Sequence, residues 1–284
     1  MFFVTLLSRL PLSVLYFFSD FLFVVSFYVV RYRRKLVQKN LKNAFPEKKL
    51  AELKVIEKEF YVNLCDYAVE TLKLLTISRE ELGKRMIFKN AELALKYAEN
   101  GHSVLHLTSH QFNWEWGLVT ACLTFPFQMD FVYQSVSSKF FEELSLKIRT
   151  RFGAHPIKRD EVARETIKRK SILRGIALMA DQYPGYGRDK KYETKFLNQD
   201  TVFFYGANQL AVLMQYPVVF YELRKMRRGY YQATIVNISS PPYNKESDII
   251  IESYVRGVEK VIQENPAGWL WTHNRWKKRH LRKA

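Results

Sequence analysis

Residues 106–116 read HLTSHQFNWEW, and the rest of the chain is organised around this stretch. The apolar run Ser103–Leu107 leads into it and has the length and composition of a buried strand. Residues 111–124 then have the character of a helix. His110 and Glu115 therefore fall near a strand-to-helix junction, where an α/β sheet presents side chains at one end. We expect a functional site at this junction.

His110 and Glu115 are a candidate catalytic pair. Neutral imidazole is the side-chain base whose ordinary pKa lies closest to neutral pH. A carboxylate that accepts from the other ring nitrogen fixes the tautomer and stabilises the imidazolium. Such a pair can deprotonate an alcohol that attacks an acyl carbonyl. The alternative is a histidine that caps the helix beside a surface glutamate. Spacing alone favours this plainer interpretation, because His-x4-Glu is a weak pattern.

Several other chemistries lack their sequence signatures. The chain has no Gly-x-Ser-x-Gly elbow, so a covalent acyl-enzyme is not indicated. It has neither of the glycine-rich phosphate loops, so we expect no nucleotide cofactor. His106 and His110 lack a third ligand nearby, and we expect no metal. Cys65 and Cys122 are expected to be small core residues of a reduced, cytosol-facing protein.

The positive charge of the chain is concentrated rather than spread. The formal net charge is +17, and residues 31–46 and 275–284 each carry six Lys or Arg and no acid. A nucleic-acid binder more often distributes its cations along a folded groove, so nucleic acid is not an expected partner. The first run directly follows an apolar segment, an arrangement typical of an anionic membrane surface.

Residues 1–30 are almost wholly apolar and aromatic, and we expect them to form a membrane anchor. About 20 apolar residues suffice to span a bilayer. Pro11 and the charge of Asp20 near mid-segment favour a shallow or monotopic anchor over a true span. The basic run that follows predicts that residues 31–284, the expected catalytic domain, lie on the cytoplasmic side.

The body of the chain alternates between strand and helix patterns. This alternation predicts an α/β sheet with helices on both faces. Residues 183–202 look like a long polar loop, of the kind that is usually functional or mobile. The expected strands are residues 103–107, 129–134, 176–180, 217–221 and 231–238, and the expected helices are residues 48–76, 91–100, 111–124, 139–152, 160–173, 203–215 and 247–264.

Cations in the body could meet a phosphorylated substrate. The candidates are Lys139, Lys147, Arg149, Arg151, Lys158 and Arg159. Most of them are expected to lie on solvated helix faces. Arg149 and Arg151 are the better candidates, because a bidentate guanidinium suits phosphate. If both lie on one helix, only one of them can face the substrate.

The motifs together resemble one family. SHQFNWEW resembles the His-x3-Trp-Glu signature of the late acyltransferases of bacterial lipid A synthesis. The resemblance continues in order along most of the chain. It includes NLKNAFPE after the basic run, IRTRFGAHPI, ALMADQYPG, TVFFYGANQLAVLMQYPVVFYELR and NPAGWLWTHNRWKKR.

The resemblance implies a membrane acyltransferase with a fold like that of glycerophosphate acyltransferases. Such an enzyme moves an acyl chain from an acyl carrier protein or coenzyme A thioester to a lipid hydroxyl, at the cytoplasmic face of the inner membrane. His110 would be the general base and Glu115 its orienting partner. Arg149, Arg151, Asp181 and Gln182 lie in the blocks that would bind substrate.

Two departures from the family pattern leave the acceptor open. Gln111 and Phe112 replace the usual glycine-rich approach to the Asn-Trp-Glu motif, and the loop after Gln182 is richer in Tyr and Lys. An O-acyltransferase of an aminolipid or another glycolipid fits equally. A lysophospholipid enzyme would normally show Asp in place of Glu115. A basic, non-catalytic membrane-binding protein would explain the charge and the anchor, but not the aligned motifs.

Overall fold

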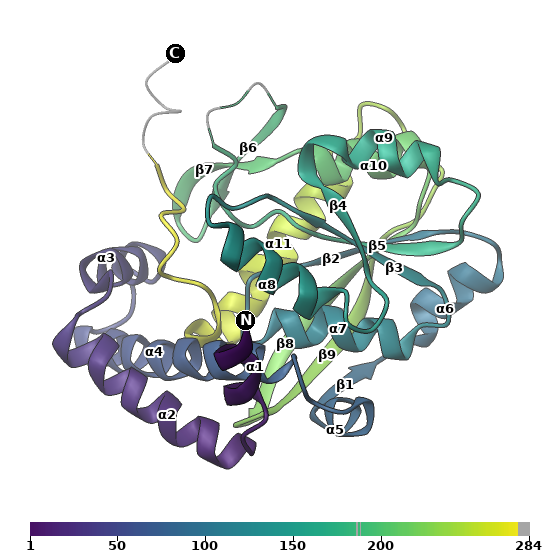
Figure 1. Cartoon of the computed structure of the whole chain (residues 1–284). Helices are drawn as coiled ribbons and strands as arrows, with labels where there is room; N and C mark the ends of the chain where they lie inside the picture. The colour runs from purple at the N-terminus through teal and green to yellow at the C-terminus, as the bar shows by residue number, and fades with distance from the viewer. Residues whose placement is uncertain (186, 188, 278–284) are drawn as a thin grey trace.

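The computed structural model describes residues 1–185, 187 and 189–277. Its centre is a seven-stranded mixed sheet in the order β1-β9-β8-β2-β5-β3-β4, in which only β8 and β9 pair antiparallel (Figure 1). The strands are β1 (Met86–Lys89), β2 (Val104–Thr108), β3 (Gln128–Tyr133), β4 (His155–Lys158), β5 (Arg174–Met179), β8 (Val218–Arg227) and β9 (Tyr230–Ser239). The predicted α/β sheet is confirmed.

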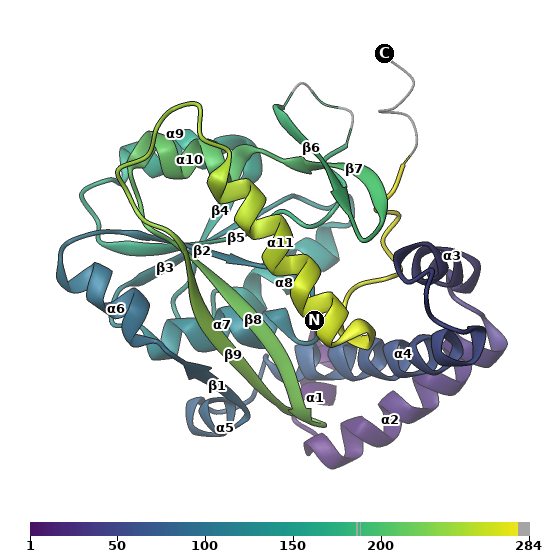
Figure 2. The ribbon, with the colours of Figure 1, turned by 180° about the vertical axis from the view of Figure 1, so that it is seen from behind.

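Helices cover both faces of this sheet. Side chains alternate along a strand, so neighbouring residues belong to different layers of the core. Val104 packs in the layer beneath α6 (Glu92–Glu99) and α7 (Trp114–Thr124). Leu105 packs in the opposite layer, beneath α10 (Gly206–Met214) and α11 (Ile249–Glu264). Figure 1 shows α7 in front of the sheet, and Figure 2, seen from behind, shows α11 in front of it.

The N-terminal helices pack beside the sheet rather than standing apart from it. The elements are α1 (Phe2–Ser8), α2 (Leu12–Val24) with a π-helical turn at Val25–Val29, α3 (Arg34–Ala44) and α4 (Leu50–Lys73). Both views show α2 running alongside α4. Leu12, Leu15 and Phe27 are buried in the core. The division of the chain at residue 30 into an anchor and a catalytic domain stays a prediction. Residues before this boundary pack against residues after it.

Leu12–Val29 is long and apolar enough to cross a membrane by length and composition, and 22% of this segment is buried inside the protein. A helix of a soluble core would be mostly buried, whereas much of this one is not. One side of the segment packs on the protein, and its other apolar side chains are not covered by the protein.

The predicted loop at residues 183–202 is wrong over its second half. Strands β6 (Lys191–Phe196) and β7 (Gln199–Phe204) form an antiparallel hairpin there. Leu197 and Asn198 in its turn both have positive φ, 47° and 62°, as a two-residue type I′ turn requires. The polar residues of KYETKF obscured a strand whose last residue, Phe196, is buried against Trp269.

Other elements differ from the prediction mainly at their ends. Helix α8 spans Lys139–Arg149, so Arg151 lies beyond it, and α9 spans only Val162–Lys168. The predicted helix at residues 203–215 begins at Gly206, because Phe203 and Phe204 belong to β7. A short helix, α5 (Arg79–Arg85), and the edge strands β1 and β4 were not predicted. Of the second basic run, Lys278, Arg279, Arg282 and Lys283 lie outside the described residues.

Candidate active site

Two neighbouring parallel strands bring His110 and Asp181 together. Thr108 at the end of β2 lies opposite Met179 at the end of β5. His110 and Asp181 each follow two residues later, so both emerge at the same edge of the sheet. The His110 Nδ1 atom lies 2.7 Å from Oδ1 of Asp181. The register of the two strands therefore places a base beside an acid that is 71 residues away in sequence.

Asp181 is fully buried and accepts three hydrogen bonds. The donors are the His110 ring, the backbone N–H of His110 at 2.9 Å and Nε1 of Trp269 at 2.8 Å. Burial alone would raise the pKa of Asp181, but the contacts with His110 and the Trp269 donor outweigh it and hold that pKa below its usual value. Asp181 is therefore a fixed carboxylate at neutral pH.

The loop that carries His110 is clamped by a segment near residue 269. Leu270 N–H donates to the carbonyl of His110 (3.1 Å), and Phe112 N–H donates to the carbonyl of Gly268 (2.8 Å). Phe112 has a φ of 46°, a left-handed conformation that is costly for a bulky residue and needs such support. A Cβ on Gly268 would lie 2.4 Å from the Phe112 ring, so glycine is required for this approach. The clamp fixes the backbone on both sides of Gln111.

Glu115 contacts a different partner from the one that the sequence predicted. It lies in the first turn of α7, next to the N-cap Asn113, whose Oδ1 accepts from Trp116 N–H at 2.9 Å. Both Glu115 oxygens accept from Arg149, Oε2 from Nε at 2.8 Å and Oε1 from Nη2 at 2.5 Å. The carboxylate on the His110 ring is Asp181 instead. The expected orienting contact from Glu115 is therefore replaced by a buried, bidentate ion pair.

Burial and the Arg149 charge act in opposite directions on Glu115. Burial would raise the pKa of its carboxyl, but Arg149, together with the Trp114 donor and the nearby His110, outweighs burial and holds that pKa below its usual value. The pair as a whole is neutral. Nη1 of Arg149 donates to none of the residues that the structure describes, so one edge of this guanidinium is left for another group.

A third carboxylate of the site, that of Glu70, accepts a hydrogen bond from Asn113. Oε2 of Glu70 on α4 accepts from Asn113 Nδ2 and from the Tyr231 hydroxyl, both at 2.7 Å, and Oε1 accepts from the Tyr16 hydroxyl at 2.8 Å. Burial raises the pKa of Glu70 to about 7 in spite of these three donors. One side chain thus connects α2, α4, β9 and the start of α7.

A cavity of about 620 Å³ opens beside these groups. Its polar lining includes His110, Glu115, Arg149, Arg159 and Gln182. Much of the remaining wall is apolar or aromatic and comes from α4, from α8 and the loop before it, and from β7; examples are Tyr67, Leu144, Ile148 and Phe204. At its opening Val136 and Phe141 are exposed. A polar end and a long apolar wall suit an amphipathic ligand.

Not every residue singled out from the sequence lies here. Arg151 does not line the cavity; its Nη1 donates to the carbonyl of Leu74 at 2.6 Å. His106 is buried in β2 against the Tyr221 hydroxyl, and burial lowers its pKa to about 3. No cluster of three or more potential metal ligands is found in the part of the chain that the structure describes. Sequence reasoning missed Trp269, although its Trp-rich segment was noticed.

The sheet and the site bring together a histidine–carboxylate pair at the strand ends and a cavity of about 620 Å³ beside it. The chain belongs to the bacterial lipid A biosynthesis acyltransferase family, whose sequence profile matches residues 1–278. This match confirms the resemblance seen in the sequence and identifies an acyltransferase of lipid A and lipopolysaccharide biosynthesis. No curated protein matches the chain.

Proposed function

We propose that the protein transfers a fatty acyl chain from a thioester of acyl carrier protein or coenzyme A to a hydroxyl of a lipid A precursor. The observation that carries this proposal is the orientation of His110. Asp181 occupies Nδ1, and Nε2 makes no hydrogen bond to any residue described in the structure, although the side chain lines the cavity. Nε2 is the nitrogen that meets the substrate.

His110 acts first as a general base. Nε2 takes the proton of the acceptor hydroxyl while the hydroxyl oxygen attacks the thioester carbonyl carbon. Asp181 accepts from Nδ1–H, holds the tautomer and stabilises the imidazolium without taking the proton. The tetrahedral intermediate collapses as its carbon–sulfur bond breaks, and His110 returns the proton to the leaving thiolate. The products are an ester and a free thiol.

Arg149 donates a hydrogen bond to the carbonyl oxygen of the thioester. Its charge is already balanced by Glu115, so it offers a neutral pair to an incoming group. That pair suits a carbonyl oxygen that develops charge better than a phosphate that arrives with full charge. Nη1 is the donor, and Glu115 fixes the plane of the guanidinium. This role replaces the phosphate contact that the sequence suggested for Arg149.

Arg159 is the better-placed cation for an acceptor phosphate. It lines the same cavity as His110, and its guanidinium lies over the Phe204 ring. Its ion pair with Asp189 is long, at 3.6 Å, and both side chains are substantially exposed. An exchangeable surface pair of this kind is weak, so Arg159 can turn to a phosphate at little cost.

The apolar surface of residues 1–30 supports membrane association, and the exposed basic residues after it support a location of the body on the cytoplasmic face of the inner membrane. Val136 and Phe141 at the opening of the cavity give a lipid substrate an apolar entrance.

Lipid mass spectrometry of a deletion strain tests the proposal. We expect a lipid A species that lacks one acyl chain, restored by the wild-type chain and not by His110→Ala. His102→Ala is the matched control, because His102 is exposed on the loop before β2. A deletion strain with unchanged lipid A and an aminolipid that lacks an acyl chain would overturn the choice of acceptor. Normal lipids throughout would overturn the activity.

A further inference from the structure

Helix α2 has two faces of opposite character. Leu15 and Ser19 are buried, whereas Phe17 and Phe21 are 71% and 61% exposed. Further large apolar side chains are exposed on α1, on α2 and on the turn after it: Phe2, Phe3, Leu6, Leu7, Val14, Phe18, Leu22, Val24 and Val29. An exposed apolar surface this continuous marks an interaction site rather than a face in water.

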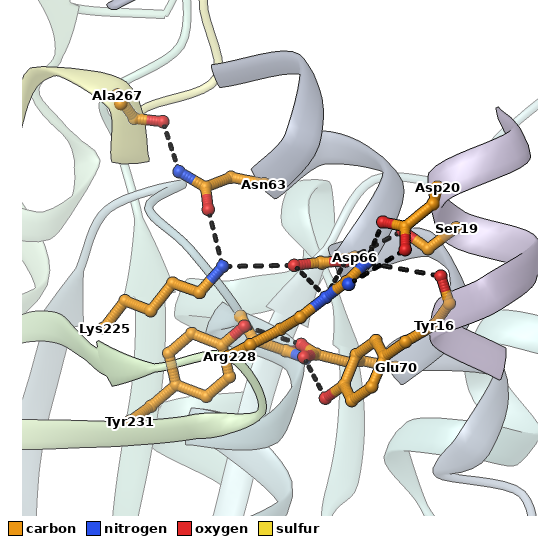
Figure 3. Close-up of polar contacts among 11 residues, drawn as sticks. Tyr16, Ser19, Asp20, Asn63, Asp66, Glu70, Lys225, Arg228, Tyr231 and Ala267 are labelled. Atoms are coloured by element: carbon orange, nitrogen blue, oxygen red, sulfur yellow. Dashed lines mark hydrogen bonds and ion pairs between the residues drawn. The ribbon is translucent and has the colours of Figure 1, made fainter. Parts of the chain in front are cut away.

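The other face of α2 is docked through a polar cluster, drawn in Figure 3. Asp66 on α4 is fully buried and accepts from Ser19 Oγ at 2.8 Å. It also accepts from Arg228 Nη2 at 2.7 Å and lies 3.1 Å from Lys225 Nζ, both at the end of the β8–β9 hairpin. Arg228 Nη2 donates as well to Asp20 on α2, at 2.6 Å. One guanidinium thus joins α2, α4 and the sheet.

The docking extends along the whole helix. Lys73 Nζ donates to the carbonyl of Leu10 at 2.8 Å, next to the start of α2. Tyr16 meets Glu70 in the middle, and Ser26 Oγ lies 3.5 Å from Cys65 Sγ near the far end. The residue numbers of the partners on α4 decrease from 73 to 65 as those of the N-terminal segment increase from 10 to 26. The two helices are therefore antiparallel neighbours.

This arrangement conflicts with a helix that crosses the membrane. Leu12–Val29 would be about 27 Å long as an α-helix, close to the thickness of the hydrocarbon core. An upright helix that stayed docked would carry Asp66 and Arg228 into the hydrocarbon. A helix that undocked would leave Asp20, near the middle of the segment, without its cation in lipid. Both alternatives place charged groups where no water can reach them.

We propose that α1 and α2 lie along the membrane surface within one leaflet, with the Phe17–Phe21 face in the acyl region and the Ser19 face on the protein against Asp66. The exposed Asp20 lies at the border between these two faces, paired with Arg228. The proposal rests on the membrane association proposed above and specifies its geometry. Exposed cations follow the helix directly, at Arg31, Arg33, Lys35, Lys39 and Lys42. An anionic headgroup layer is the surface that complements an apolar face bordered by these cations. Both ends of α2 then lie on the cytoplasmic side.

A disulfide between α2 and α4 tests whether the docked state is the membrane-bound one. Ser26→Cys places a thiol opposite the native Cys65. We expect oxidation of the full-length variant in its membrane to cross-link it, without release from the membrane and without loss of activity. Ser13→Cys is the matched control, because Ser13 is exposed and should give no cross-link. A Ser26→Cys variant that cross-links in detergent but not in the membrane would overturn the proposal.

Labelling from the outer side of the inner membrane tests the orientation. Phe3→Cys, in a chain with Cys65→Ala and Cys122→Ala, should not react with an impermeant maleimide added to the periplasm of intact cells. Reaction there would show a span and overturn the proposal. A nitroxide at Phe17→Cys should be accessible to oxygen dissolved in vesicles containing anionic phospholipid. Strong spin–spin coupling between two chains at this position instead would assign the face to a second copy.

The two proposals fail separately. A protein that cross-links and stays inaccessible from the periplasm, but transfers no acyl chain, keeps its membrane geometry and loses its proposed activity. Acyl transfer by a chain that is labelled at Phe3→Cys from the periplasm would support the proposed activity and overturn the proposed membrane geometry.

Discussion

The imidazole of His110 is hydrogen-bonded to Asp181, although Glu115 is only five residues away in sequence. Asp181→Asn should lower kcat on the order of 10³-fold to 10⁴-fold, because a neutral amide does not stabilise the imidazolium. Its NH₂ group is also a donor and cannot accept a hydrogen bond from Trp269 or His110. Acyl-transfer kinetics in detergent would measure the loss. Asp200→Asn, at an exposed site on β7, is the control. Activity near that of the wild type would remove Asp181 from the mechanism.

The ion pair between Glu115 and Arg149 should couple stability to activity. Glu115→Ala alone leaves a largely buried guanidinium, 20% exposed, without its carboxylate and should cost roughly 3 kcal/mol of unfolding free energy. The double variant with Arg149→Ala should recover part of that loss while remaining slow in transfer. Denaturant unfolding of the four chains in a double-mutant cycle checks this. The exposed pair Glu161–Arg164 should cost less than about 1 kcal/mol in the same experiment.

Arg159 and Arg149 should affect different kinetic constants. Arg159→Ala should raise KM for a phosphorylated acceptor by roughly tenfold to a hundredfold and leave kcat nearly unchanged, as loss of a charged hydrogen bond predicts. Arg149→Lys should lower kcat for every acceptor, because one ammonium cannot both pair with Glu115 and reach the carbonyl oxygen. The same effect of Arg159→Ala on an acceptor without phosphate would contradict its assignment.

Glu70 should make the stability of the protein depend on pH. Its pKa is raised from 4.5 to about 7 in the folded state, so the folded chain holds a proton that the unfolded chain has lost between these values. The contribution of this proton is complete below pH 4.5 and is lost as pH rises to about 7, on the order of 3 kcal/mol in all.

Glu70→Gln should remove this dependence, because glutamine mimics the protonated acid at every pH. Unfolding in detergent at several pH values from about 4.5 to 8 would compare the two chains. We expect the variant to gain on the wild type as pH rises. A constant difference across the range would show that Glu70 does not titrate there.

Gly268→Ala should reduce transfer strongly with a smaller effect on stability. Its Cβ would meet the Phe112 ring at 2.4 Å and displace the loop that carries His110. Gly83→Ala is the control, since a Cβ there meets nothing within 4 Å. The kcat of both variants, measured at matched folded fractions, separates a shifted base from an unfolded protein. Equal kcat in the two variants would mean that the clamp does not position His110.

Local sequence patterns were sufficient to predict the five inner strands of the sheet and the place of His110. Apolar strand residues such as Val104 and Leu105 are buried on both faces, and a run of this kind is visible without any knowledge of its neighbours. The partner of His110 was not predictable in the same way. Glu115 was chosen because it is near in sequence, while Asp181 becomes a neighbour only through the register of β2 and β5.

The β6–β7 hairpin and the role of Trp269 were missed for related reasons. The hairpin strands are half polar, so their pattern resembles a loop until Phe196 is seen packed against the indole of Trp269. Trp269 itself could be noticed as an unusual residue, but its contact with Asp181 depends on how the chain returns after α11. Long-range returns of this kind leave no periodic signal in the sequence.

The bond from Trp269 to Asp181 also sets an order of events during synthesis. Trp269 follows Asp181 by 88 residues, which takes a bacterial ribosome roughly 4 to 18 seconds to add. During that interval α2, His110 and Asp181 have all been made, but the indole donor and the backbone clamp at Gly268 have not. With α2 bound to lipid as we propose, a nascent chain can reach the membrane before it can transfer an acyl group.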